Sequence, residues 1–119
     1  MNRQHLQYRT KQLALRVIKM TETLPENRTS NVIARQVLRS ATSVGANYRA
    51  SLRAKSVADR INKLKIVEEE ADETLYWLEL LVEANIVPQH LLKDLMVETN
   101  EIVAMTVASI KTLRNKKHS

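Results

Sequence analysis

The chain has 119 residues, with one glycine, two prolines, four aromatic residues and no cysteine. This length fits one small domain, and the lack of cysteine excludes disulfides, thiolate zinc sites and a cysteine nucleophile. Sandwiches, barrels and glycine-rich phosphate loops need more turn residues, so the composition favours an all-α fold. The formal net charge of +6 at pH 7 points to an acidic partner rather than a basic one.

The first helix is expected at about residues 4–23, where apolar residues recur at helical spacing before Pro25 and Asn27 end it. Its first 20 residues are basic and acid-free, as in a transit peptide, but no cleavage site of small residues follows. An ordinary first helix is the better interpretation. Because no run of 18 apolar residues occurs, we expect no membrane span and a cytoplasmic protein.

The second helix is expected at about residues 31–54, with Thr29 or Ser30 as its N-cap. A mid-helix glycine costs about 1 kcal/mol relative to alanine, so Gly45 predicts the close approach of another helix. The apolar arc of this helix consists of Ile33, Val37, Leu38, Ala41, Val44, Tyr48 and Leu52.

The third helix is expected at about residues 57–84, opened by a capping-box variant between Ser56 and Asp59. Successive apolar positions of this helix are spaced alternately four and three residues apart, which predicts a heptad seam that contains one glutamate. The seam consists of Val57, Ile61, Leu64, Glu68, Ala71, Leu75, Leu78 and Val82. A second apolar stripe, a candidate subunit interface, consists of Ile66, Trp77 and Leu80. Alternatively, Trp77 packs against Tyr76 at the edge of the bundle.

The fourth helix is expected at about residues 89–113, after a break at Asn85 and Pro88, with a polar tail at 114–119. Its apolar positions are Leu92, Leu95, Ile102, Met105 or Val103, Ile110 and Leu113. Four amphipathic helices joined by short connections predict an up-down-up-down antiparallel four-helix bundle that forms a single domain over residues 1–119.

Charge is segregated along the second and third helices. Residues 28–65 contain nine Lys or Arg and one acid, whereas residues 66–85 contain seven acids and no base. Four arginines form one stripe, about 27 Å long at 1.5 Å per residue, on the second helix. They are Arg35, Arg39, Arg49 and Arg53. The stripe either pairs with the acidic half of the third helix, in the same or a neighbouring subunit, or binds nucleic-acid phosphates through paired guanidinium donors.

The sequence gives little support to base stacking, metal binding or catalysis. Only Tyr48 interleaves with the arginine stripe, so recognition of single strands by base stacking is poorly supported. No glutamate has a histidine three residues later, as a di-iron bundle requires. The acids at 68–73 point in different directions on a helix and cannot converge on one ion. We therefore expect no enzymatic activity, no metal and no cofactor.

Four motifs in the second and third helices carry a resemblance to a known family. They are RQVLRSATSVGANYRA (35–50), KLKIV (63–67), EADET (70–74) and LYWLELL (75–81). Through them the chain resembles, over about residues 10–112, the 23S rRNA intervening-sequence protein family, also called the S23 or four helix bundle protein family. The resemblance implies a small bacterial four-helix bundle, often a homopentamer, with no enzymatic activity known for the family as a whole. It also implies a fold similar to that of the accessory protein of diversity-generating retroelements.

The chain departs from this family pattern at two positions. Arg60 stands where many relatives carry an aromatic residue, and Ala50 stands where many carry a glutamate. Both changes make the net charge near the arginine stripe more positive, so Arg60 joins the candidate nucleic-acid contacts.

The sequence thus predicts a non-enzymatic homo-oligomeric bundle, a pentamer by resemblance, that contacts RNA or DNA backbone through a basic face. The candidate contacts are Arg35, Arg39, Arg49, Arg53 and Arg60. The alternative function is an oligomeric scaffold that binds a protein partner and uses its charge segregation for subunit docking.

Overall fold

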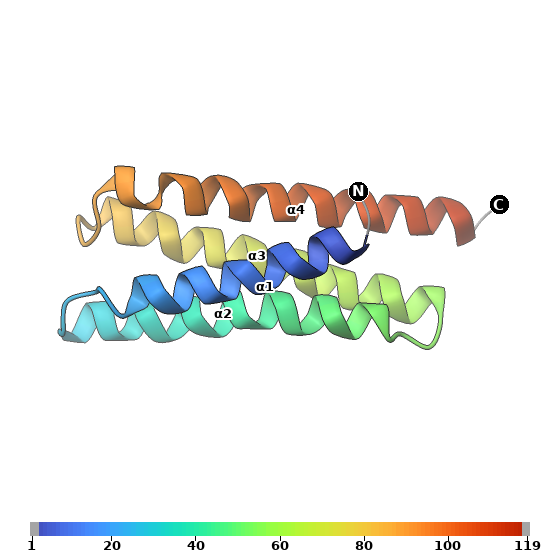
Figure 1. The fold of residues 1–119 in the computed structure, drawn as a ribbon, viewed down its shortest axis with the longest axis horizontal. Helices are drawn as coiled ribbons and strands as arrows, with labels where there is room; N and C mark the ends of the chain where they lie inside the picture. Colours follow the sequence, from blue (N-terminus) through green and yellow to red (C-terminus); the bar gives the residue numbers. More distant parts are fainter. Residues whose placement is uncertain (1–2, 118–119) are drawn as a thin grey trace.

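Four α-helices joined by three short connections form residues 3–117, the part of the chain that the computed structural model describes (Figure 1). In chain order they are α1 (Arg3–Thr21), α2 (Arg28–Leu52), α3 (Val57–Glu83) and α4 (Gln89–Lys117). Figure 1 shows the chain reversing direction at each connection, so consecutive helices are antiparallel. The all-α four-helix bundle expected from the periodicity is confirmed, and its helices run up-down-up-down.

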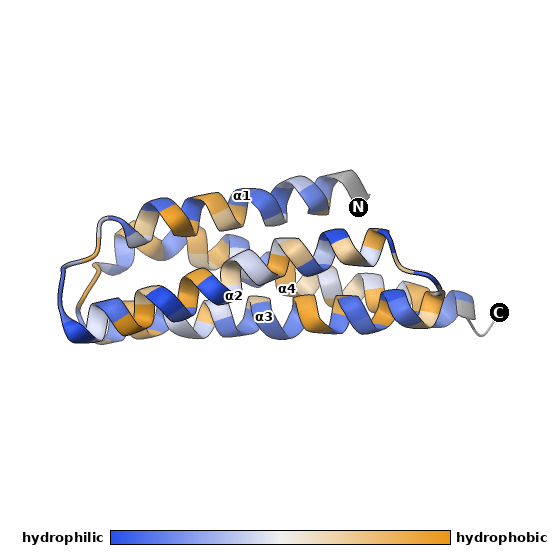
Figure 2. Cartoon of the chain, turned by 90° about the horizontal axis from the view of Figure 1, so that it is seen from below, coloured by the Kyte–Doolittle hydropathy of each residue, from blue (hydrophilic) through white to orange (hydrophobic). Residues whose placement is uncertain are grey.

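The helices form a rod of 52 × 22 × 20 Å. α2 packs against α1 and α3, and α3 packs against α2 and α4, whereas α1 and α4 touch along a much sparser seam. Figure 2 shows hydrophobic and hydrophilic segments alternating along each helix. Because each helix turns its apolar positions inward, the buried side chains merge into one core.

The start of α2 differs from the sequence expectation. The helix begins at Arg28 rather than near residue 31, because its N-cap is Asn27 and not Thr29 or Ser30. The Asn27 side chain accepts a hydrogen bond of 2.9 Å from the backbone N–H of Ser30. Asparagine is among the best N-cap residues, so the residue expected to end the preceding segment instead opens the next helix.

The start of α3 agrees with the expected capping box. Ser56 is the N-cap, and its side chain accepts a hydrogen bond of 3.0 Å from the N–H of Asp59. The Asp59 carboxylate accepts a bond of 3.2 Å from the N–H of Lys55. These two bonds fix the Asp59 carboxylate at the turn between α2 and α3.

The end of α3 depends on local backbone chemistry, and α4 extends beyond its expected end. Asn85, at φ 60°, ends α3 in the left-handed region, and the N–H of Ile86 bonds to the carbonyl of Leu81 at 3.0 Å. This bond is typical of a Schellman motif, with asparagine in the place usually taken by glycine. At its far end α4 continues to Lys117, beyond the expected boundary at residue 113, and residues 118–119 of the expected tail lie outside the described residues.

The predicted heptad seam of α3 is correct in part. Ile61, Leu64, Ala71 and Leu78 are buried, but Val57 is 41 % exposed. Elsewhere the buried positions are one residue earlier than expected, at Val67, Thr74 and Leu81 in place of Glu68, Leu75 and Val82. The reason is that α3 packs on both α2 and α4, so its buried face is wider than a two-helix seam.

Gly45 lies where α2 crosses α1. A Cβ atom placed on Gly45 would lie 3.3 Å from the backbone oxygen of Thr10 on α1. This distance is tighter than ordinary van der Waals contact, so glycine lets the two backbones approach. The close helix approach predicted at Gly45 is confirmed.

Candidate nucleic-acid interface

Arg39 lies on α2 against the acidic half of α3. Its guanidinium donates to Glu70 Oε2 at 2.9 Å and also pairs with Glu73. The hydrogen bond to Glu70 is the main cause of a raised pKa of Arg39. The intramolecular pairing considered from the sequence is therefore present at Arg39, and a phosphate that binds this side chain must compete with two carboxylates.

Arg49 and Arg53 lie one turn apart near the end of α2, where an open groove of about 620 Å³ separates this helix from the start of α3. The groove is lined by Ala46, Arg49, Ala50, Arg53, Lys55, Asp59 and Lys63. Four of these seven residues are cations and one is an acid. The two alanines have short side chains, which leaves room between the charged groups.

The cations of the groove differ from Arg39 in their pairing. Within residues 3–117, none of Arg49, Arg53, Lys55 and Lys63 has a carboxylate oxygen within 4.0 Å. Arg49, Arg53 and Lys55 are exposed, and Lys63 is half-buried. Four unneutralised cations around a concave surface produce a positive potential that attracts anions.

The groove has no base-stacking surface. None of its lining residues is aromatic. Tyr48, the aromatic residue that interleaves with the arginine stripe in the sequence, is only 2 % exposed and belongs to the apolar core. The groups that can contact a ligand in the groove are therefore guanidinium and ammonium groups, which bind phosphates rather than bases.

The other two candidate arginines do not line the groove. Arg35 is exposed on α2, about three turns before the groove begins, and Arg60 is half-buried on α3. Lys55 and Lys63, which do line it, were missed because only the spacing along one helix was considered. The signal that identifies them is the short turn at 53–56, which folds the start of α3 back onto the end of α2.

The candidate interface residues of α3 have mixed environments. Ile66 is 38 % exposed, and Leu80 is half-buried. Trp77 packs against the core, donates its indole N–H to Glu73 at 3.2 Å and meets the ring of Tyr76 edge-on, with 5.2 Å between centroids. The packing of Trp77 on Tyr76, the alternative weighed from the sequence, is thus present in the single chain.

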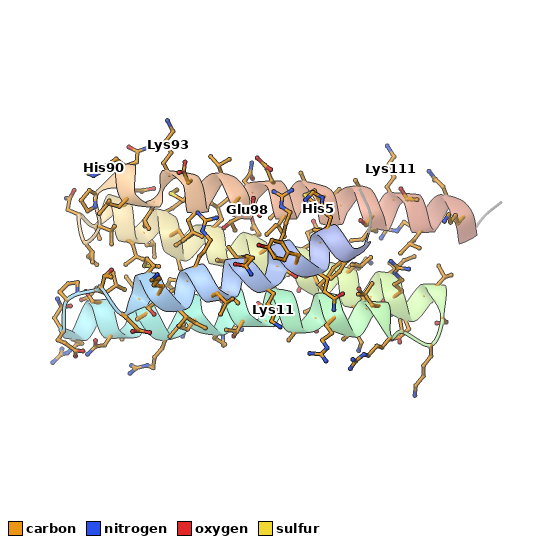
Figure 3. The ribbon with its side chains drawn as sticks, in the orientation of Figure 1. His5, Lys11, His90, Lys93, Glu98 and Lys111 are labelled. Atoms are coloured by element: carbon orange, nitrogen blue, oxygen red, sulfur yellow. The ribbon has the colours of Figure 1, made fainter. Side chains whose placement is uncertain are left out.

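A second charged cluster, not expected from the sequence, joins α1 to α4. Arg9 donates from Nε to Glu98 at 2.8 Å and from Nη2 to Glu101 at 2.7 Å, and Nη1 contacts the sulfur of Met105. Figure 3 shows Glu98 on the side of α4 that faces α1, whereas Lys93 and Lys111 point away from the bundle. The hydrogen bond to Glu98 is the largest cause of a raised pKa of Arg9, and the same bond lowers the pKa of Glu98.

The described part of the chain offers neither a metal site nor a helix that could span a membrane. Among residues 3–117, no three His, Asp or Glu side chains gather closely enough to hold a metal ion. None of the helices in this range combines the length and apolar character needed to cross a bilayer.

Comparisons with known proteins identify the family. The family model of the 23S rRNA-intervening sequence protein matches residues 4–108. A crystal structure of a protein of unknown function from the S23 ribosomal protein family of Bacteroides thetaiotaomicron is 34% identical, with a TM-score of 0.87 over 93% of this chain and 99% of that chain. No curated protein matches the sequence. The chain belongs to the 23S rRNA-intervening sequence protein family.

Proposed function

We propose that this protein binds the sugar–phosphate backbone of nucleic acid through the groove between α2 and α3, and that it catalyses no reaction. The observation that carries the proposal is the set of four cations in the groove, which have no carboxylate partner among the described residues. Arginine and lysine are the residues that most often bind phosphate oxygens. Arg35, exposed on the same helix, extends this basic surface.

The chemistry of the groove determines the mode of binding. Phosphate contacts fix the position of a strand but do not read its sequence. With about four phosphates neutralised, the logarithm of the binding constant should fall with the logarithm of salt concentration with a slope of about −3.6 for duplex DNA. Binding is therefore expected to be strong at low salt, weak at high salt and nearly independent of base sequence.

The test compares two charge-reversed variants with equal net charge. Arg49→Glu combined with Arg53→Glu reverses the groove, and Lys93→Glu combined with Lys111→Glu reverses the outer edge of α4 (Figure 3). Fluorescence anisotropy with a labelled duplex measures binding, and circular dichroism checks that both variants stay helical. We expect the groove variant to lose binding and the α4 variant to retain most of it. Equal binding by both variants would reject the groove as the site.

Arg39 is left out of this test for a structural reason. Its side chain pairs with Glu70 and Glu73, so reversing its charge would place three acids together at the packed junction of α2 and α3. A loss of binding in such a variant would not separate a phosphate contact from damage to the fold.

We also propose that the protein is a homo-oligomer, and the second candidate function is an oligomeric scaffold for a protein partner. Apolar surface on α3 supports self-association, with Ile66 38 % and Tyr76 52 % exposed. Light-scattering mass at low and high salt, with and without a structured RNA, separates the two functions. A mass that increases with RNA only at low salt supports phosphate binding, whereas an oligomer indifferent to RNA supports the scaffold.

A further inference from the structure

One carboxylate, that of Asp59, lies among the four cations of the groove. It forms no ion pair with any of them among the described residues. Its Oδ2 atom instead accepts the backbone N–H of Lys55 at 3.2 Å, and its own N–H donates to Ser56 Oγ at 3.0 Å. The backbone of the turn thus holds the Asp59 carboxylate in place. Its negative charge can interact with a ligand in the groove.

A carboxylate in the groove lowers the affinity for a ligand whose only polar groups are phosphates. An ionised aspartate accepts hydrogen bonds and donates none, so it repels phosphate oxygens and cannot bond to them. Its two oxygens offer about four acceptor positions, of which the backbone of Lys55 uses one. The groove therefore favours a ligand that presents a hydroxyl donor close to its phosphates.

The ribose of RNA presents such a donor. Each RNA nucleotide carries a 2′-hydroxyl that can donate and accept, and DNA lacks it. Asp59 and Lys63 lie one turn apart on α3, so their Cβ atoms are about 5–6 Å apart. A strand whose phosphate binds Lys63 thereby brings a neighbouring ribose toward Asp59.

We infer that the groove selects RNA over DNA, because its four cations hold backbone phosphates while the Asp59 carboxylate accepts a hydrogen bond from a ribose 2′-hydroxyl. This inference rests on the proposed function and names the class of nucleic acid for the same site. Without the hydroxyl, the Asp59 charge opposes binding; with it, the same charge contributes a charge-assisted hydrogen bond.

The experiment uses three short duplexes of one sequence, made of RNA, of 2′-fluoro RNA and of DNA. The 2′-fluoro duplex keeps the A-form and the phosphates of RNA, but fluorine cannot donate a hydrogen bond. Anisotropy titrations of the full chain at low salt give the three affinities. We expect RNA to bind about 10- to 100-fold more tightly than 2′-fluoro RNA, the range for one hydrogen bond to a charged group.

The matched variant is Asp59→Asn. The asparagine side chain can still accept the N–H of Lys55, so the helix start is retained, and its NH₂ group then offers a donor to the groove in place of an acceptor. We expect this variant to lose the difference between RNA and 2′-fluoro RNA and to bind DNA more tightly than the wild type.

The outcomes separate this inference from the proposal on which it rests. Equal affinity of the wild type for RNA and 2′-fluoro RNA overturns the role of Asp59 but leaves backbone binding intact. A preference that persists in Asp59→Asn also overturns it. If the wild type binds none of the three duplexes, the proposed function fails, and the inference fails with it.

Discussion

The α2–α3 and α1–α4 seams each contain one arginine bound by two glutamates, but the two clusters lie in different surroundings. The Arg39 side chain is 51 % exposed and sits on a seam that the helices already pack tightly. The Arg9 side chain is 17 % exposed and joins α1 to α4, where few other contacts exist. We therefore expect the exposed Arg39 cluster to contribute little to the free energy of unfolding. The Arg9 cluster should contribute more, because its partial burial strengthens charged hydrogen bonds.

The largest effect is expected from a change that separates α1 from α2. Gly45→Leu would drive a large side chain into the backbone of Thr10, which already lies 3.3 Å from a Cβ position. Because the obstacle is backbone rather than the end of a flexible side chain, overpacking here should lower the free energy of unfolding by about 3 kcal/mol or more. Urea denaturation followed by circular dichroism measures the change. Thr42→Leu, at an exposed position of the same helix, is the control and should have little effect.

A smaller effect is expected when the arginine of each cluster is removed. Arg9→Ala takes away the bonds to Glu98 and Glu101 and should lower the free energy of unfolding by about 1.5–3 kcal/mol, the range for hydrogen bonds to charged groups. Arg39→Ala should lower it by about 0–1 kcal/mol, as for exposed ion pairs. Both changes are measured by urea denaturation at one ionic strength. Equal losses in the two variants would contradict the difference drawn between the seams.

The smallest effect is a dependence of stability on pH that arises from Glu98 in the α1–α4 cluster. The hydrogen bond from Arg9 lowers the pKa of Glu98 below its ordinary 4.5, against the opposing effect of burial. A carboxylate with a depressed pKa in the folded state contributes stability above its unfolded pKa and loses it as the pH falls through the folded value. We expect the free energy of unfolding to fall more steeply below about pH 5 in the wild type than in Glu98→Gln. Parallel pH curves would show that Glu98 makes no such contribution.

The fold could be predicted because its main signals are local. The helical spacing of apolar residues, the capping box at Ser56 and the glycine at position 45 each depend on residues close together in the sequence. The start of α2 was predicted wrongly because several neighbouring residues could each cap the helix. Asn27 follows Pro25 and suggests a break, but its side chain caps a helix as well as that of Ser30 and better than that of Thr29.

The candidate site was harder to predict because it depends on which helices are neighbours. Arg39 and Arg49 are equivalent in the arginine stripe, yet of the two only Arg39 forms ion pairs with acids on α3. Lys63 joins Arg49 only after the chain folds back at the turn between α2 and α3. The bond between Arg9 and Glu98 spans 89 positions, and no periodicity along a single helix indicates such a contact.

The reversal of the chain between α2 and α3 also makes the charge distribution of the molecule asymmetric along its long axis. The basic residues from Arg49 to Lys65 come together at the end where these helices join, while the acids from Glu68 to Glu83 extend toward the other end. A rod 52 Å long with charge distributed in this way has a large dipole moment along its axis. In the field of a polyanion such a molecule turns its basic end forward, so the nucleic acid proposed as its ligand would first meet the end of the rod that carries the groove.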